Sequence, residues 1–127
     1  MGFKLKADVV LNHVSDEHPW FKTLLDNGAH QDKFYIRHQQ PVFKKEIINS
    51  NTVCHYQEPD GRVTSRPVIL NDSVDNHYRQ INLKGKPAWA YHSFYPFQPD
   101  INWQNPDVML YILDVIGFWS SKGVDIF

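Results

Sequence analysis

The fold is decided near the start of the chain, where residues 3–13 read FKLKADVVLNH. The β-forming run Val-Val-Leu at positions 9–11 shows little alternation between apolar and polar residues. That pattern is typical of a parallel strand covered on both faces. Asn12 and His13 follow directly, so we expect both residues at the carboxyl end of a buried parallel strand.

The middle of the chain begins with one short helix and continues as irregular, strand-like sequence. Pro19 can begin a helix over residues 20–26, and Asn27-Gly28 tolerates the positive φ expected at its end. The stretch from position 28 to 98 holds five prolines and an Asp60-Gly61 pair between apolar runs, which predicts a hairpin. About seventy residues of this kind exceed normal loop length, so we predict an inserted β-rich subdomain.

The end of the chain predicts a helix followed by a second strand. Asn105-Pro106-Asp107 is a helix start, and Lys122-Gly123 is a helix end. Residues 124–127 then begin another strand, which completes one βαβ unit with a decorated loop. A parallel strand with one short partner predicts low stability for these 127 residues alone. The helix carries an apolar stripe at Val108, Tyr111, Ile112, Val115 and Trp119.

Length and charge exclude several classes of protein. The chain has 127 residues, whereas a complete eight-stranded α/β barrel needs about 250. Its 13 basic and 14 acidic residues are scattered, so no nucleic-acid partner is expected. No apolar run approaches the roughly 20 residues of a membrane span, so no membrane partner is expected. Cys54 is the only cysteine, which excludes an intrachain disulfide and favours a reducing, cytoplasmic compartment.

Three motifs occur in order along the chain: DVVLNH at 8–13, QPDIN at 98–102 and FWSSKGVDIF at 118–127. They resemble, respectively, the end of the third barrel strand, the end of inserted domain B, and the lead into the fourth strand of the α-amylase superfamily, glycoside hydrolase family 13. HPWF at 18–21 is similar to the branch that holds α-glucosidases, oligo-1,6-glucosidases, trehalose synthases and amylosucrases.

The resemblance implies an α/β fold, a partial (β/α)₈ TIM barrel from the third strand to the start of the fourth, with an inserted β-rich domain B. On this basis residues 1–13 form barrel strand 3, and residues 14–97 form the domain B-like region. Residues 98–127 then return to the barrel with helix 3 and the start of strand 4. We therefore expect the chain to be an internal part of a longer enzyme.

The resemblance also implies that no residue of this chain is catalytic. Retaining glycosidases need a nucleophilic carboxylate and an acid/base carboxyl about 5 Å apart. The family takes both from the fourth and fifth strands, so we expect them beyond Phe127. Asp8 is expected to be a buried structural acceptor.

His13 is the predicted substrate contact. An imidazole N–H at a strand end can bond a sugar hydroxyl more strongly as positive charge develops on the ring. The resemblance implies contact with the 6-hydroxyl of the glucosyl unit that is cleaved. The alternative is a packed histidine whose nitrogens bond neighbouring backbone. The other histidines fit no zinc spacing and are interpreted as scattered surface residues.

Asn12 and Asp100 match two family positions whose side-chain oxygens can bind a structural calcium ion where domain B meets the barrel. Calcium takes six to eight oxygen ligands, so hydrogen bonding between the two parts is the alternative. No other cofactor is expected. Several aromatic residues lie at the end of the inserted stretch and just after it. Core packing, rather than stacking on sugar, is predicted for most of them: Phe94, Tyr95, Phe97 and Trp103.

The implied function is retaining hydrolysis or transglycosylation at α-glucosidic bonds of oligosaccharides or disaccharides, with this chain inactive alone. A sucrose-active or trehalose-forming member is an alternative, because residues 92–98, HSFYPFQ, resemble the amylosucrase stretch. A non-catalytic barrel homologue, such as a transporter heavy chain without the catalytic carboxylates, is a second alternative. Arg, one residue, then Asp directly after Phe127 would distinguish the enzymes from that homologue.

Overall fold

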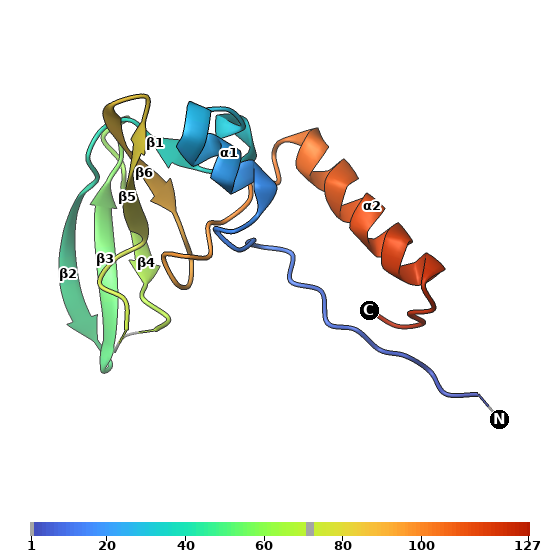
Figure 1. Ribbon diagram of the computed structural model, residues 1–127. Coiled ribbons are helices and arrows are strands. Elements are labelled where there is room, and N and C mark those ends of the chain that lie inside the picture. Colours follow the sequence, from blue (N-terminus) through green and yellow to red (C-terminus); the bar gives the residue numbers. More distant parts are fainter. Residues whose placement is uncertain (1, 71–72) are drawn as a thin grey trace.

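Two antiparallel sheets and two α-helices make up the observed architecture (Figure 1). The computed structural model describes residues 2–70 and 73–127; positions 71 and 72, part of a formal glycosylation sequon at 71–73, lie outside these ranges. No helix within the ranges is long and apolar enough to cross a membrane. In chain order the elements are α1 (Pro19–Asn27), the 3₁₀ helix η1 (Gln31–Lys33), β1 (Ile36–Arg37), β2 (Val42–Ile48), β3 (Asn51–Gln57), β4 (Val63–Pro67), β5 (Tyr78–Leu83), β6 (Lys86–Tyr91) and α2 (Pro106–Ser121).

The two sheets have the strand orders β1-β6-β5 and β2-β3-β4; hairpins join all their neighbouring strands except β1 and β6. The predicted Asp60-Gly61 hairpin is confirmed, since Gln57 of β3 pairs with Val63 of β4. Two further hairpins were not predicted, and they turn at Asn49-Ser50 and Lys84-Gly85, where all four residues have positive φ. A two-residue turn in which both residues have positive φ matches the right-handed twist of the strands on either side. The inserted stretch is therefore β-rich, as predicted.

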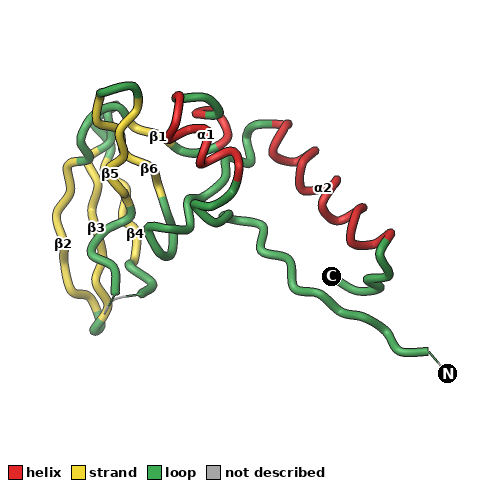
Figure 2. The backbone as a smooth tube through the Cα atoms, viewed as in Figure 1, coloured by secondary structure: helices red, strands yellow, loops and turns green. Residues whose placement is uncertain are grey.

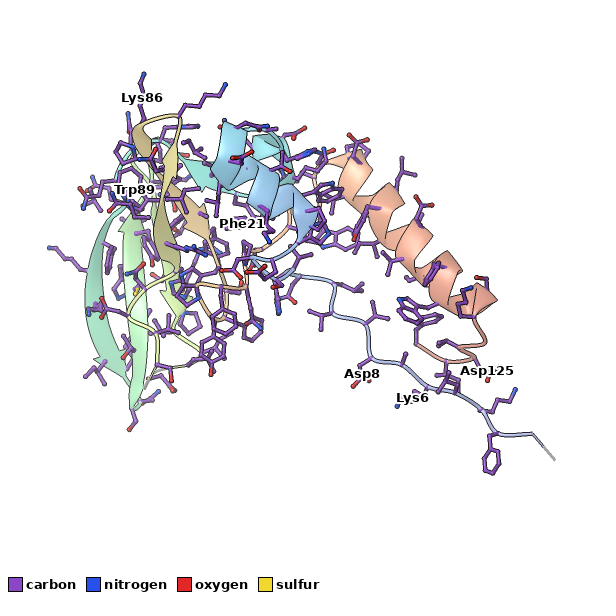
Figure 3. The ribbon with its side chains drawn as sticks, viewed as in Figure 1. Lys6, Asp8, Phe21, Lys86, Trp89 and Asp125 are labelled. Carbon is purple, nitrogen blue, oxygen red and sulfur yellow. The ribbon has the colours of Figure 1, made fainter. Side chains whose placement is uncertain are left out.

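Helix α1 forms where the sequence predicts it and covers the first sheet. His18 Nδ1 accepts a hydrogen bond from Trp20 N–H at 3.1 Å, and Gly28 ends the helix with φ 77°. Phe21 and Leu24 of α1 are fully buried, and Phe21 points beneath the helix (Figure 3). The main core cluster is Phe21, Leu24, Phe34, Ile81, Leu83, Ala88, Ala90, Ile101, Val108 and Ile112. A smaller cluster on the second sheet is Cys54, Tyr56 and Val68.

Helix α2 and the N-terminal segment extend away from the sheets (Figures 1 and 2). The predicted helix is confirmed: the Asn105 side chain caps its first turn, and Gly123 follows its end with φ 104°. Of the predicted apolar stripe, Val108 and Ile112 are buried, whereas Trp119 is half exposed. The stripe therefore finds core partners only at the start of the helix.

The predicted strand over residues 3–11 is wrong in extent, because the structure has a single parallel bridge there, between Lys6 and Ile126. Asp125 N–H donates to the Leu5 carbonyl at 2.8 Å beside it, and Lys6 and Asp125 come from neighbouring segments in Figure 3. The parallel direction agrees with the predicted βαβ unit. A strand forms only where a neighbouring strand takes its hydrogen bonds, and within the described ranges residues 3–11 have one short neighbour, the segment around Ile126.

Candidate functional site

Two segments distant in sequence meet at what we call the junction, residues 12–16 against residues 97–101. Val14 N–H donates to the Pro99 carbonyl at 3.1 Å, and Ile101 N–H donates to the Asn12 carbonyl at 3.0 Å. His13 and Asp100 form an antiparallel bridge between these bonds. The structure thus brings together all three residues that the sequence nominates, Asn12, His13 and Asp100.

Within the described ranges, His13 is the junction residue that has a buried side-chain nitrogen without a hydrogen-bond partner. Its Nδ1 is buried and has no hydrogen-bond partner within the described ranges. Its ring lies 5.5 Å from the Phe94 ring, at an interplanar angle of 58°. A buried polar atom left unpaired costs about 1–3 kcal/mol, so such atoms are usually satisfied. No backbone group within the described ranges satisfies Nδ1, so the packed-histidine alternative lacks the hydrogen bond it requires.

Asp100 is a buried acceptor rather than a free carboxylate. Ser93 N–H donates to Oδ1 at 2.8 Å, and the Ser93 hydroxyl donates to Oδ2 at 2.6 Å. Burial raises the pKa of the Asp100 carboxyl, while the two bonds from Ser93 lower it. Both oxygens are therefore occupied in holding residues 93–100 in a closed turn.

The residues at the junction do not fit calcium. Both Asp100 oxygens bond Ser93, and Asn12 contributes its backbone carbonyl to the junction, with no side-chain hydrogen bond within the described ranges. No group of three or more His, Cys, Asp or Glu side chains in those ranges could hold a metal ion. Calcium needs six to eight oxygen ligands, so two residues fall well short. Hydrogen bonding is the use that this arrangement supports.

Two histidines that we interpreted as surface residues are buried, which corrects the sequence analysis. His77 and His92 are 3% and 2% exposed. His92 Nδ1–H donates to the Phe94 carbonyl at 3.0 Å and so holds the residue that packs against His13. Burial lowers the pKa of His92 to about 4, which keeps the ring neutral. The available signal was the alternation of Ala88 and Ala90 along one face of β6, which continues to His92 just after the strand.

The aromatic residues around the junction are not mainly in the core, so that prediction is wrong for two of them. Phe97 is 51% exposed and stacks on Tyr95 at 5.0 Å, and Trp103 is 40% exposed. Trp103 Nε1–H donates to the Leu11 carbonyl at 2.5 Å. Asp8, expected to be buried, is exposed (Figure 3), because no further strand covers the face of its segment within the described ranges.

Both carboxylates of the junction, Asp16 and Asp100, already have hydrogen-bond donors. Asp16 accepts from Arg79 at 3.0 Å, and Asp100 accepts from Ser93. Neither is placed as a free partner for a second carboxyl group.

Comparison with known proteins matches the whole chain. The family model described as "Alpha amylase, catalytic domain" matches residues 1–127. Similar relatives include an amino acid transporter heavy chain SLC3A1 of Rattus norvegicus, 32% identical over 124 residues, and a probable oligo-1,6-glucosidase 3 of Bacillus subtilis (strain 168), 31% identical over 134 residues. A trehalose synthase/amylase TreS of Mycolicibacterium smegmatis is 32% identical over 126 residues. Each match covers 98% of this chain but only 16%, 19% and 18% of the respective relative.

Proposed function

The chain belongs to the α-amylase catalytic-domain family, glycoside hydrolase family 13, and from this membership we propose that the whole protein is a retaining α-glucosidase-type enzyme. It would hydrolyse or transfer glucosyl units at α-glucosidic bonds of oligosaccharides or disaccharides. The observation that carries the proposal is the family match over all 127 residues. The buried His13 nitrogen, which has no partner among the described residues, is consistent with it.

The proposed architecture follows the family. Residues 1–13 would be the third barrel strand, residues 14–97 domain B, and residues 98–127 the return to the barrel with its helix and the start of the fourth strand. The parallel bridge between Lys6 and Ile126 supports neighbouring parallel strands, and the two antiparallel sheets between them support a β-rich insertion.

The proposed role of this chain is to bind and orient the glucosyl unit. His13 would bond its 6-hydroxyl, and that bond would strengthen as positive charge develops on the sugar ring. Phe94, held by His92, would pack the imidazole in place. The nucleophile and the acid/base carboxyl would lie beyond Phe127, so residues 1–127 alone would be inactive. Asn12 and Asp100 would join the two parts by hydrogen bonds, and chelation of calcium by EGTA would leave the melting temperature unchanged.

A transporter heavy chain is the second candidate, because one relative at 32% identity bears that description. Whether Arg, any residue and Asp follow Phe127 in the full-length protein separates the two readings. A sucrose-active or trehalose-forming enzyme is a finer alternative, supported by the similarity to a trehalose synthase/amylase.

The test is to assay the full-length protein on maltose, isomaltose, sucrose and trehalose. His13→Ala should lower kcat/KM on the best substrate by about 10- to 100-fold, the equivalent of a hydrogen bond worth about 1.5–3 kcal/mol. His38→Ala is the matched control, since His38 is exposed and lies outside the junction. Unchanged kinetics in His13→Ala would refute its role, and no turnover of any of the four sugars would refute the enzyme.

A further inference from the structure

The second sheet has an open edge along β2. This strand forms the outer side of the sheet (Figure 1), and among the described residues no backbone hydrogen bond from outside the sheet reaches it. Its side chains at Val42, Ile47 and Ile48 are 62%, 77% and 42% exposed. The opposite edge strand, β4, ends in Pro67, which has no N–H to donate. A seven-residue edge with exposed apolar side chains is a template for another strand.

Alternate residues of β2 point their backbone N–H and C=O groups away from β3. Ile48 and Asn51 flank a two-residue turn, so they form a hydrogen-bonded pair, and such pairs alternate along the hairpin. Phe43, Lys45 and Ile47 lie at the other positions. Their backbone groups are therefore directed to the outer edge, where a further strand can bond them.

The sequence of β2, VFKKEII, is complementary to itself when two copies run antiparallel with Lys45 opposite Lys45. Three kinds of pair then form, each of them twice: Val42 with Ile48, Phe43 with Ile47, and Lys44 with Glu46. The outward-directed residues also lie opposite one another in this register, so the backbone and the side chains require the same alignment. Centring the pairing on Lys44 or on Glu46 would instead place like charges opposite each other.

The charges of β2 are matched in this register, although two adjacent lysines on an edge ordinarily oppose pairing. Lys45, which would meet the same residue of the second copy, is already paired with Asp75. Lys44 would lie opposite Glu46 at a position that is not hydrogen-bonded, where side chains approach most closely. Glu46 Oε2 lies 2.8 Å from His55 Nε2, a contact that holds the carboxylate on the open face of the sheet.

We propose that β2 is the contact surface for a second copy of this protein, and that two β2 strands join their sheets into one continuous antiparallel sheet. Two seven-residue strands bury little surface, so the dimer is weak and reversible, with a dissociation constant in the micromolar range or above. The contact uses no residue of the junction. It therefore goes beyond the proposed function and holds whether or not the protein is an enzyme.

Sedimentation equilibrium of the full-length protein over a range of concentrations tests the proposal. We expect the average mass to rise with concentration as chains associate in pairs. Lys44→Glu and Glu46→Lys each convert two opposite-charge pairs into two like-charge pairs, so each should raise the dissociation constant about tenfold or more. Lys86→Glu, at the exposed start of β6, makes the same charge change away from β2 and should leave the dissociation constant unaltered.

Mixing the two single variants gives the most specific result, because the Lys44→Glu chain is complementary to the Glu46→Lys chain. The mixture should associate about as tightly as the unaltered protein. The double variant Lys44→Glu/Glu46→Lys should also associate again, and it decides the outcome if a single variant folds poorly. A mass that does not change with concentration in the unaltered protein would overturn the proposal.

Single variants that associate as tightly as the unaltered protein would also overturn it, as would a mixture and a double variant that stay monomeric. The sugar assays remain a separate result. Association in a protein that turns over none of the four sugars would refute the proposed function and keep this inference, whereas a monomeric protein that cleaves one of them would refute this inference alone.

Discussion

Two regions of the molecule differ in how they pair their strands and bury their apolar side chains. We call them the body, residues 12–105, and the terminal pair, residues 2–11 with residues 106–127. In the body every strand but the two-residue β1 finds a partner within a hairpin, and Phe21 and Tyr56 are fully buried. In the terminal pair one parallel bridge joins the segments, and Phe3, Phe118 and Trp119 remain 99%, 53% and 51% exposed. Antiparallel hairpins complete themselves locally, whereas parallel strands need partners from elsewhere in a sheet.

The largest expected effect contrasts one phenylalanine from each region. Phe21→Ala should destabilise the body, within the full-length protein, by about 3–5 kcal/mol, because it leaves a cavity among buried neighbours. Phe3→Ala should change the free energy of unfolding by less than about 0.5 kcal/mol. Urea unfolding followed by tryptophan fluorescence measures both. Equal effects of the two substitutions would break the distinction between body and terminal pair.

Acid should destabilise the body and spare the terminal pair. Burial lowers the pKa of His77 below 6.5 and that of His92 from 6.5 to about 4. Because burial keeps both rings neutral in the folded protein, their contribution is complete above pH 6.5 and falls as the pH drops below it, for His92 down to about pH 4. For His92 the loss is about 3 kcal/mol.

The measurement is hydrogen exchange of β5 and β6 at matched intrinsic rates between pH 6.5 and 4. His92→Gln should flatten the dependence, and His38→Gln, at an exposed position, should leave it intact. A stability that stays level over this range in the unaltered chain would contradict the neutral, buried state of both histidines.

Removing the Ser93 hydroxyl should weaken the junction by an intermediate amount. Ser93→Ala deletes the donor to Asp100 Oδ2 and leaves a buried carboxylate oxygen without its bond. The expected cost is about 1–2 kcal/mol in the free energy of unfolding of the body. Ser120→Ala on the exposed face of α2 is the control. A cost for Ser120→Ala as large as that for Ser93→Ala would contradict the proposed closure of residues 93–100.

The smallest expected effects have opposite signs in the two regions. Gly28→Ala should cost about 1 kcal/mol, because φ is 77° and a Cβ there would meet Lys84 Cε at 3.2 Å. Gly117→Ala should stabilise α2 by about 0.5–1 kcal/mol, because this helical glycine has open space around it. Thermal melting of both variants checks the signs. A stabilising Gly28→Ala would show that this turn does not need its left-handed residue.

Local sequence signals predicted the helices and one hairpin well. Pro19 and Gly28 bracket α1, and the Asn105 cap begins α2, because capping depends on a few neighbouring residues. The hairpins at Asn49-Ser50 and Lys84-Gly85 were missed, since neither is an Asn-Gly or Asp-Gly pair. The strand over residues 3–11 was overestimated because its formation depends on partners rather than on its own pattern.

The sequence by itself determined the family, the β-rich insertion and the choice of Asn12, His13 and Asp100, because motifs and turn residues act over short distances. Only the tertiary structure decided which atoms remain free. It buries His77 and His92 and occupies both Asp100 oxygens with Ser93, and it leaves His13 Nδ1 without a partner among the residues that the structure describes. Burial and hydrogen-bond partners at the junction depend on how residues 12–16 pack against residues 97–101, which are distant in sequence, and no local sequence pattern specifies that packing.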